Sequence, residues 1–443
     1  MDNPAAGGIV AGMEKDADGV ADVVIVGGGL NGPALALALA QAGFRVTVID
    51  ARPAPDRGEV GFDGRSYALA LGSQRLLAAI GVWPALAAVA QPILQIKASD
   101  GLAGQGAAPF FLHFDHAEIE EGPMGYLVED RHLYAAFLAA MRGLAGQQGQ
   151  AGQQGQAGLA GPAGITLLSG ETVVAQEVGP QGVRVTMASG RGVSGRLLVG
   201  SDGRGSGTAT RAGIGRVGRS YGQTALVTAV DHARHHQGIA HQFFMPGGPF
   251  AILPLAGGHR SSIVWSEEQG LAAEIQALGD ADYLTALRPR FGNFLGEIGL
   301  AGPRYTYPLS LSLAERFVQA RLALVGDAAH GVHPIAGQGL NLGLRDVGAL
   351  AEVLVLAARR GEDIGAVDVL QRYQRWRRFD VTAMGVGTDL VNRLFSNDNP
   401  LLRLGRDLGM GMVSRVPALR RGFIRQAAGL TGDVPKLLAG LPI

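Results

Sequence analysis

The chain has 443 residues with a formal net charge of zero, 47% hydrophobic and 17% charged residues, and no cysteine. This size and composition predict a packed globular protein of two or three domains. The absence of cysteine excludes disulfides, thiolate chemistry and iron–sulfur ligation by this chain. A net charge of zero provides no general attraction to nucleic acid, so no nucleic-acid partner is expected.

Residues 1–20 lack the basic start and apolar core of a signal peptide, so we expect a flexible tail. No apolar run further along reaches the ~18 residues that a membrane-spanning helix needs. A cytoplasmic location is therefore the expectation.

The first motif is a glycine-rich turn between an apolar strand at Asp22–Val26 and a helix of alanine and leucine that ends near Gly43. A second strand, Arg45–Ile49, leads directly to the acidic residue Asp50. The glycines of the turn are Gly27, Gly29 and Gly32. Strand, glycine turn, helix, strand and acid in this order form the dinucleotide-binding fingerprint. In it, the glycines admit a pyrophosphate and the carboxylate accepts hydrogen bonds from ribose hydroxyls.

The middle of the chain contains a low-complexity stretch, 143–164, in which GQQGQA occurs twice in tandem. Such a sequence cannot build a core, so we expect a surface loop after an amphipathic helix at Arg131–Arg142. Alternating segments predict antiparallel strands, at Ile93–Ala98, Thr224–Val230, His241–Phe244 and Ser262–Trp265. Three aromatic residues there wall either an apolar substrate pocket or an ordinary core: Phe243, Phe244 and Phe250.

The most informative segment runs from Leu322 to Val347 and reads LALVGDAAHGVHPIAGQGLNLGLRDV. It predicts a buried strand, a turn carrying Asp327, a loop of small residues and a helix from about Gln338. The carboxyl end of a strand in an open α/β sheet is where nucleotide cofactors lie. The helix would present its first backbone N–H groups, from Gly339, Leu340 and Asn341, to an anionic ligand. A reduced flavin ring is one such ligand, so the segment predicts a flavin enzyme.

Histidine is the remaining candidate metal ligand, and we expect no metal site. His232, His235 and His236 crowd into one segment, DHARHH, without a second ligand set. His330 and His333 lack the helical spacing typical of zinc ligands. They are the titratable groups nearest in sequence to the expected flavin, so a role in proton handling and a role in packing both stay open.

The C-terminal stretch 401–443 is basic, with seven Arg or Lys residues against two acids, alternating with apolar residues. A basic amphipathic stretch of this kind can lie on an anionic membrane surface. The alternative is a packed helical cap with a solvated face.

Taken together, these segments resemble the single-component flavin aromatic hydroxylases, and within them the ubiquinone-biosynthesis hydroxylase family. Further segments that carry the resemblance are LLVGSDGRGS at 197–206, FFMPGGPFAILPL at 243–255, SSIVWS at 261–266 and DLVNRLFSN at 389–397. The resemblance implies an α/β fold in which a Rossmann-like FAD-binding domain is interleaved with an antiparallel-sheet substrate domain, followed by a C-terminal helical region. The expected FAD domain comprises 21–91, 126–214 and 305–360. The expected substrate domain comprises 92–125 and 215–304, and the helical region is 361–443.

The resemblance also assigns cofactor contacts to individual residues. Gly27, Gly29, Gly32 and Asp50 would hold the adenosine half and pyrophosphate of FAD. Arg65, Arg131, Asp202 and Asp327 would contact the cofactor further along. Pro334, Gly337, Gly339, Leu340 and Asn341 would line the flavin ring. No catalytic residue is certain, and the candidates in the flavin loop are His333, Pro334 and Gly337.

One departure from the family pattern follows the Asp-Gly motif. The family spaces a serine and an arginine as SxxR, whereas here Ser206 is followed at that spacing by Ala209, and Arg211 lies two residues further on. This departure leaves the binding of the reductant open. Because one dinucleotide fingerprint is present, we expect NAD(P)H to visit transiently or a separate protein to donate electrons.

The expected function is FAD-dependent hydroxylation of the aromatic ring of a polyprenylated phenol in ubiquinone biosynthesis, with O₂ as co-substrate. In this class, reduced flavin and O₂ form a C4a-hydroperoxyflavin that attacks an electron-rich ring. The small and apolar loop Pro334–Gly339 would exclude the water that wastes this species. An enzyme that modifies a lipid is expected to associate peripherally with the inner membrane. A ubiquinone-biosynthesis complex is a further expected partner.

Three other functions are weighed against this expectation. A flavin halogenase is disfavoured because the WxWxIP segment is missing, and Trp83, Trp265 and Trp376 stand isolated. An FAD-dependent epoxidase, or a hydroxylase of another lipophilic substrate, is the main alternative. A prenyl-lipid escort protein without flavin is disfavoured by the complete set of FAD residues.

Overall fold

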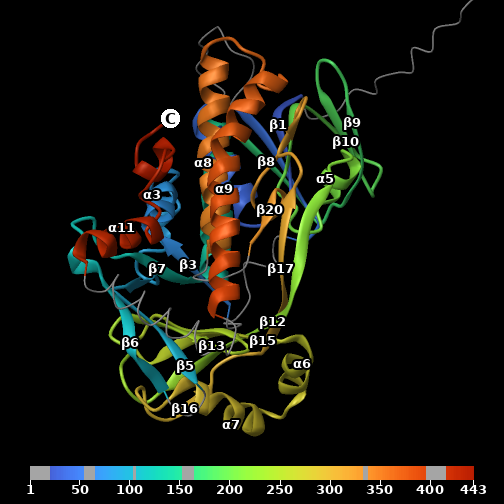
Figure 1. Cartoon of the computed structure of the whole chain (residues 1–443). Helices are drawn as coiled ribbons and strands as arrows, with labels where there is room; N and C mark the ends of the chain where they lie inside the picture. Colours follow the sequence, from blue (N-terminus) through green and yellow to red (C-terminus); the bar gives the residue numbers. More distant parts are fainter. Residues whose placement is uncertain (1–19, 54–64, 103–105, 152–163, 333–337, 396–415) are drawn as a thin grey trace, which may run out of the picture.

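The computed structural model describes residues 20–53, 65–102, 106–151, 164–332, 338–395 and 416–443. These residues form an eight-stranded sheet, a nine-stranded sheet and a three-stranded sheet. Figure 1 shows the long helices α8 (Gln338–Arg359) and α9 (Val367–Phe395) running side by side beside the first sheet and ending above the second.

The eight-stranded sheet carries the glycine-rich turn. Its strands are β1 (Ala21–Val26), β2 (Arg45–Asp50), β8 (Gly164–Ser169), β9 (Val173–Val178), β10 (Val183–Met187), β11 (Gly192–Gly200), β18 (Val318–Gln319) and β19 (Leu322–Leu324). Strand β1 pairs in parallel with β2 and β11, and β11 pairs in parallel with β19. Because parallel strands end at the same edge, the loops that follow these four strands meet there.

Helix α1 (Asn31–Gln41) packs against this sheet and against α8, and its residues from Gly32 to Ala40 are all buried. Its alternating alanines and leucines could suggest a strand by period alone. Alanine and leucine are, however, the strongest helix formers, and a helix that is apolar all round belongs in a core. The sequence prediction of a helix here is therefore confirmed.

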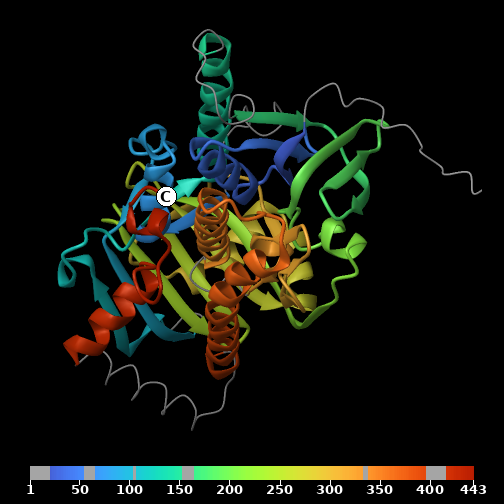
Figure 2. The same ribbon diagram turned by 90° about the horizontal axis from the view of Figure 1, so that it is seen from above.

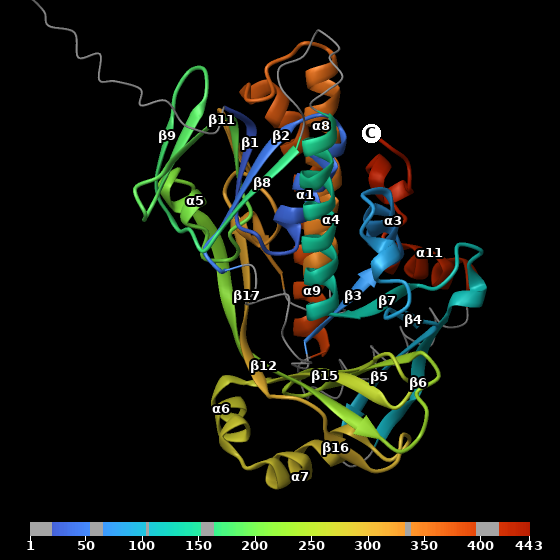
Figure 3. The same cartoon turned by 180° about the vertical axis from the view of Figure 1, so that it is seen from behind.

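Helix α4 (Asp130–Ala151) packs against α1 and β8, and in the view from behind it lies in front of the long helices (Figure 3). The sequence predicted that this helix ends at Arg142 and that a loop begins at residue 143. That boundary is corrected, because the helix continues to Ala151. The added turns contain alanine, leucine and glutamine, which are good helix formers and compensate for the interspersed glycines. The rest of the expected loop lies outside the described residues, as does the expected tail up to residue 19.

Most of the nine-stranded sheet lies in the lower part of the molecule in Figure 1. Its strands are β5 (Gln95–Leu102), β6 (Gly106–Asp115), β12 (Arg216–His232), β13 (Ile239–Met245), β14 (Gly248–Pro254), β15 (Arg260–Glu268), β16 (Ile298–Leu300), β17 (Tyr305–Ala314) and β20 (His330–Gly331). Helices α6 (Gln269–Ala277) and α7 (Asp280–Phe291) pack beneath it.

Two sequence predictions about this sheet are corrected. Strand β13 pairs with β5 in parallel, whereas all pairings were expected to be antiparallel. Tight hairpins force antiparallel pairing between successive strands, but β5 and β13 are joined through the first sheet and are free of that constraint. Strand β17 pairs with β12, so residues 305–314 belong to this sheet and not to the FAD-binding unit.

The three-stranded sheet bridges the other two. It contains β3 (Ser66–Ala70), β4 (Gln91–Ile93) and β7 (Gly125–Glu129), with α3 (Leu71–Ala79) packed beside it. Its residues Ile93 and Leu127 share a hydrophobic cluster with Ala229 and Ala240 of the nine-stranded sheet. The upper face of the large sheet therefore looks toward β3, β7 and α9.

The C-terminal helix α11 (Pro417–Ala427) stands at the outer edge of the molecule, as the view from above shows (Figure 2). Arg420 and Arg425 fix it to the connection between β6 and β7 by ion pairs with Glu118 and Glu121, at 2.6 and 3.0 Å. No helix among the described residues is both long and apolar enough to cross a bilayer.

Candidate active site

The glycine-rich turn after β1 closes against neighbouring backbone. Gly27 has φ +109°, and a Cβ there would lie 2.3 Å from the carbonyl oxygen of Ser201. A Cβ on Gly32 would lie 2.0 Å from the carbonyl oxygen of Gly27. By contrast, a Cβ on Gly29 would meet no heavy atom of the described residues within 4 Å, apart from its own chain neighbours. The turn is thus tightly packed on the protein side and open at Gly29.

Asp50 ends β2 at the same edge and is 6% exposed. The hydroxyl group of Tyr134, on α4, donates a hydrogen bond to the carbonyl oxygen of Gly28 at 3.0 Å and lies 3.4 Å from Oδ2 of Asp50. One tyrosine therefore connects the glycine turn to the predicted ribose-binding carboxylate. Tyr134 was not predicted as a site residue, because nothing in the pattern of α4 distinguishes it from the other buried residues of that helix.

Asp202 follows β11 and precedes a short helix, α5 (Gly207–Arg211), whose N-cap is Ser206. Its Oδ1 accepts a 2.5 Å hydrogen bond from the Ser206 hydroxyl, and its Oδ2 accepts two 2.9 Å bonds from Thr208. The predicted cofactor-binding carboxylate is thus held rigidly by its own loop. Arg211, two residues beyond the expected SxxR position, reaches instead to Gln176 and the carbonyl oxygen of Val173.

Asp327 lies in the turn after β19, opposite the Asp-Gly loop. Arg204 spans the gap: its Nε donates to Oδ2 of Asp327 at 3.1 Å and its Nη2 to the carbonyl oxygen of Val332 at 3.1 Å. Arg216 donates to the carbonyl oxygens of Asp327 and Ala328. Burial lowers the pKa of Arg216 from its ordinary value, although Asp327 opposes the shift. Both arginines were missed, although Arg204 directly follows the Asp-Gly motif.

The two arginines expected to contact FAD lie where β3 and β7 meet α4. Arg65 pairs with Asp130 at 3.1 Å, and its guanidinium carbon lies 5.8 Å from the centre of the Tyr305 ring. Arg131 pairs with Glu129 at 2.7 Å. They therefore stand together at one junction, next to the upper face of the nine-stranded sheet.

Two tyrosines join this junction. Burial, followed by the charge of Asp130, raises the pKa of Tyr67 well above its usual range, and Tyr307 and Asp327 contribute electrostatically. Tyr307 is 42% exposed on strand β17. Because the Tyr67 hydroxyl stays protonated at any physiological pH, it can act as a hydrogen-bond donor. The sequence analysis missed Tyr67 and Tyr307, which no motif marks.

The predicted flavin loop is described in part. Gly339 and Leu340 occupy the first turn of α8 and are half-buried. The Asn341 side chain is committed elsewhere: its Oδ1 accepts from the Ala70 backbone and the Ser73 hydroxyl at 2.8 and 2.7 Å, and its Nδ2 donates to Ala68. The side chain of Asn341 therefore joins α8 to β3 and α3. His333, Pro334 and Gly337 lie outside the described residues.

The three aromatic residues of the nine-stranded sheet were expected to wall either a substrate pocket or an ordinary core. Phe243 and Phe250 lie in the core between the sheet and α7, together with Trp265 and Tyr283. Because side chains alternate along a strand, Phe244 lies on the opposite face from Phe243. On that upper face, one register row runs through Val227, Val264, Ala251, Gln242 and Ala98.

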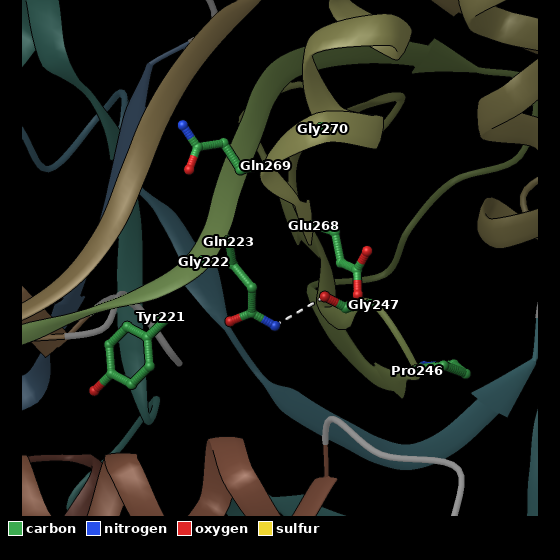
Figure 4. Close-up of a pocket in the computed structure, with 8 residues that line it drawn as sticks. All are labelled: Tyr221, Gly222, Gln223, Pro246, Gly247, Glu268, Gln269 and Gly270. Carbon is green, nitrogen blue, oxygen red and sulfur yellow. Dashed lines mark hydrogen bonds between the residues drawn. The ribbon is translucent and has the colours of Figure 1, made fainter.

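A cavity of about 440 Å³ opens at the edge of the nine-stranded sheet, where β12 bulges and α6 begins. Figure 4 shows its lining, including the Gln223 amide that donates a 2.8 Å hydrogen bond to the carbonyl oxygen of Gly247. Its lining residues are Tyr221, Gly222, Gln223, Pro246, Gly247, Glu268, Gln269 and Gly270. None of the predicted site residues lines it.

The histidines of the DHARHH segment form hydrogen bonds that hold the ends of neighbouring strands together. His236 donates from Nε2 to the carbonyl oxygen of Leu255 at 2.8 Å and accepts at Nδ1 from the Gly238 backbone at 3.0 Å. His232 contacts the Arg234 carbonyl oxygen and Ser261 at 2.7 and 3.0 Å. No group of three potential ligands that could hold a metal occurs among the described residues.

The geometry fits FAD at the edge where the strands end. In dinucleotide-binding folds the glycine turn approaches the pyrophosphate and the acid after the second strand binds the ribose. Here Gly29 leaves open space at the turn, and Asp50 ends the neighbouring strand. Asp202 and Asp327 line the same edge from the ends of β11 and β19, and α8 begins beside them.

Comparisons with known proteins agree with this geometry. A family model described as an FAD binding domain matches residues 159–384, and one described as an FAD dependent oxidoreductase matches residues 22–79. The crystal structure of p-nitrophenol 4-monooxygenase PnpA from Pseudomonas putida has the same fold, with a TM-score of 0.75 at 19% identity, covering 94% of this chain and 99% of that one.

Two curated relatives match over nearly their full length. Ubiquinone hydroxylase UbiL of Rhodospirillum rubrum is 46% identical over 445 residues, covering 100% of this chain and 97% of that protein. The 3-demethoxyubiquinol 3-hydroxylase of Escherichia coli is 35% identical, covering 92% of this chain and 98% of that protein. The chain is therefore an FAD-dependent monooxygenase. Within that class it belongs to the ubiquinone hydroxylase family.

Proposed function

We propose that this chain hydroxylates the aromatic ring of a polyprenylated phenol in ubiquinone biosynthesis, with FAD as cofactor and O₂ as co-substrate. The observation that carries the proposal is the 46% identity to a ubiquinone hydroxylase across the whole of this chain. Bound FAD supplies the oxygen-activating chemistry, and the protein supplies orientation and exclusion of water.

The FAD contacts proposed for this chain are those expected from the sequence. The backbone at Gly29 would approach the pyrophosphate, Asp50 would bind the ribose, and Asp327 would bind the linker toward the flavin. Support comes from the position of these residues at one sheet edge, with Arg204 and Tyr134 holding the loops in place.

The substrate ring would lie on the upper face of the nine-stranded sheet. The register row from Val227 to Ala98 provides a surface of small and apolar side chains with one polar member, Gln242. Tyr67 and Tyr307 border that face and can donate hydrogen bonds to a phenolic oxygen. A prenyl chain is apolar and would follow the small side chains.

Membrane contact through α11 is part of the same proposal, since a long prenyl chain keeps its substrate in the bilayer. Leu419 and Phe423, four residues apart on one helical face, are 48% and 52% exposed. Arg421 is exposed as well, but it is two residues from both Leu419 and Phe423 and so points to the other side of the helix. Because Arg420 and Arg425 are committed to ion pairs, the number of basic side chains available to lipid is smaller than the sequence indicated. Peripheral location at the inner membrane and membership of a biosynthetic complex follow as proposals.

Deletion of the gene in its host, in a strain that also lacks other flavin monooxygenase genes of this family, tests the reaction. Mass spectrometry of the quinone lipids should show an under-hydroxylated prenylated precursor, and its missing hydroxyl group would identify the carbon. The wild-type gene should restore ubiquinone. Unchanged ubiquinone without a precursor would instead direct attention to an epoxidase or another lipophilic substrate.

The reductant is testable on the purified holoenzyme. We propose that NAD(P)H visits transiently or that a separate protein donates electrons. Anaerobic mixing with NADH or NADPH should bleach the flavin absorbance if a nicotinamide acts directly. Absence of bleaching with both, under conditions where dithionite reduces the flavin, would support a protein donor.

A further inference from the structure

A single buried carboxylate fixes both ends of the turn that carries Asp327. Asp346, on α8, is 0% exposed. Its Oδ2 accepts a 2.9 Å hydrogen bond from the backbone N–H of Gly326 and lies 2.6 Å from Nε2 of His330. These two partners bracket the turn, one residue before Asp327 and three residues after it.

The other oxygen of this carboxylate is held from a different helix. Nε of Arg377, on α9, donates to Oδ1 of Asp346 at 2.8 Å, and Arg377 is also 0% exposed. Nη1 of Arg377 pairs with Asp380 at 2.8 Å, and Asp380 pairs with Arg345 at 3.4 Å. The turn is therefore connected through Asp346 to a charged network between α8 and α9.

Burying such a network costs free energy, because the charged groups lose their hydration. Replacement of a buried ion pair by apolar residues is therefore often neutral or stabilising. Burial alone would raise the pKa of Asp346, but the charges and hydrogen bonds of His330 and Arg377 hold it below its ordinary value. The carboxylate is thus ionised and can accept from the backbone of the turn.

The turn itself needs this support. Gly326 has φ +60°, and the Asn31 side chain packs within 2.3 Å of the position a Cβ would take there. The backbone beyond the short β19 therefore reverses direction in a left-handed conformation, which glycine accepts but does not enforce. Asp346 supplies the acceptor that selects it.

We propose that Arg377 and Asp346 are positioning residues for the cofactor: Arg377 orients the Asp346 carboxylate, which holds the Gly326–His330 turn so that Asp327 faces FAD. The inference rests on the proposed placement of FAD at Asp327. Neither residue is proposed to touch the cofactor, since both are fully buried between α8 and α9.

The test compares FAD affinity with stability in the full-length protein. Apoprotein of Arg377→Met is titrated with FAD by fluorescence quenching, well below its melting temperature, so that the folded form is measured. We expect the Kd for FAD to rise by about tenfold, beyond any change in melting temperature. The matched control is Arg290→Met, which breaks the Arg290–Glu267 ion pair under the nine-stranded sheet. It should lower stability and leave the Kd within about twofold of wild type.

Two further variants separate the possible failures. Asp327→Ala tests the FAD placement itself: an unchanged Kd would overturn that placement, whatever Arg377→Met shows. A weakened Asp327→Ala together with an unchanged Kd in folded Arg377→Met would overturn the positioning role alone. If Arg377→Met does not fold, Arg377→Lys decides, because it keeps the charge but cannot bond Asp346 and Asp380 with the same geometry. A wild-type Kd in that variant would equally overturn the role.

Discussion

The hydroxyl group of Tyr134 donates a 3.0 Å hydrogen bond to the carbonyl oxygen of Gly28, across 106 residues of sequence. It also lies 3.4 Å from the carboxylate of Asp50. Helix α4 thus secures the dinucleotide turn from outside the strand–turn–helix unit that contains it. The geometry of the glycine turn therefore depends on this remote contact.

Replacement of Tyr134 by phenylalanine should therefore weaken FAD binding. Loss of one buried hydrogen bond costs about 1 kcal/mol. If this cost destabilises the FAD-bound form relative to the apoprotein, the Kd rises about fivefold. Titration of the apoprotein measures it. Tyr283→Phe is the control, because the Tyr283 hydroxyl has no hydrogen-bond partner in the part of the chain that the structure describes. An equal effect of both variants on the Kd would contradict the prediction.

The glycine turn offers a pair of substitutions with opposite expectations. Gly29→Ala should leave the melting temperature of the apoprotein almost unchanged, because a Cβ meets open space, but raise the Kd for FAD by about tenfold or more. Gly32→Ala should destabilise the apoprotein by about 3 kcal/mol, since its Cβ would overlap the Gly27 carbonyl oxygen. Calorimetry and FAD titration distinguish the two. A Gly29→Ala protein with wild-type affinity would place the pyrophosphate elsewhere.

Membrane binding should depend on the exposed face of α11. Leu419→Ser together with Phe423→Ser should reduce cosedimentation with anionic phosphatidylglycerol vesicles by about tenfold and leave the melting temperature unchanged. Leu271→Ser is the control, because Leu271 is 42% exposed on α6 at the far end of the molecule. Equal loss in the control, or undiminished binding of the double variant, would argue against this surface.

Acid should destabilise the fold through its buried histidines. Burial lowers the pKa values of His232 and His236, and burial with Lys97 lowers that of His241 to about 4. In the unfolded chain histidine takes up its proton near its ordinary pKa of 6.5, whereas folded His241 stays neutral there. The contribution of these histidines to the free energy of unfolding is therefore present above pH 6.5 and is lost as the pH drops toward 4. His241 contributes up to about 3 kcal/mol of it.

Urea unfolding between these pH values measures this loss. His241→Gln should show a shallower decline than wild type, whereas His235→Gln, at an exposed position, should follow wild type. Identical pH profiles for wild type and His241→Gln would refute the assignment.

Much of the fold followed from local patterns. Strand, glycine turn and helix at the start of the chain, and strand, Gly-Asp turn and helix near residue 327, were predicted from residue types that leave few alternatives. The structure brings Gly29, Asp50, Asp202 and Asp327 to one edge, because four parallel strands end there. Parallel neighbours could be expected from the family resemblance, but no single segment specifies them.

Other features depend on contacts that sequence periodicity does not contain. The sequence prediction grouped Phe243 with Phe244, although adjacent residues of a strand lie on opposite faces. Periodicity also does not contain the fact that α7 covers the face of Phe243. The hydrogen bond from the Ser73 hydroxyl to the side chain of Asn341 joins residues that are 268 positions apart. Asp346 was inside the most informative motif, yet its role requires Arg377, which looked like one charge among many on an amphipathic helix.

If Arg377 anchors the Gly326–His330 turn as proposed, the FAD site reaches its full affinity only late in synthesis. Strand β19 must insert beside β11, α8 must pack on α1, and α9 must then deliver Arg377 to Asp346. A growing chain on the ribosome has made the glycine turn some 350 residues before this last partner emerges. On this proposal, tight FAD binding follows the synthesis of most of the chain.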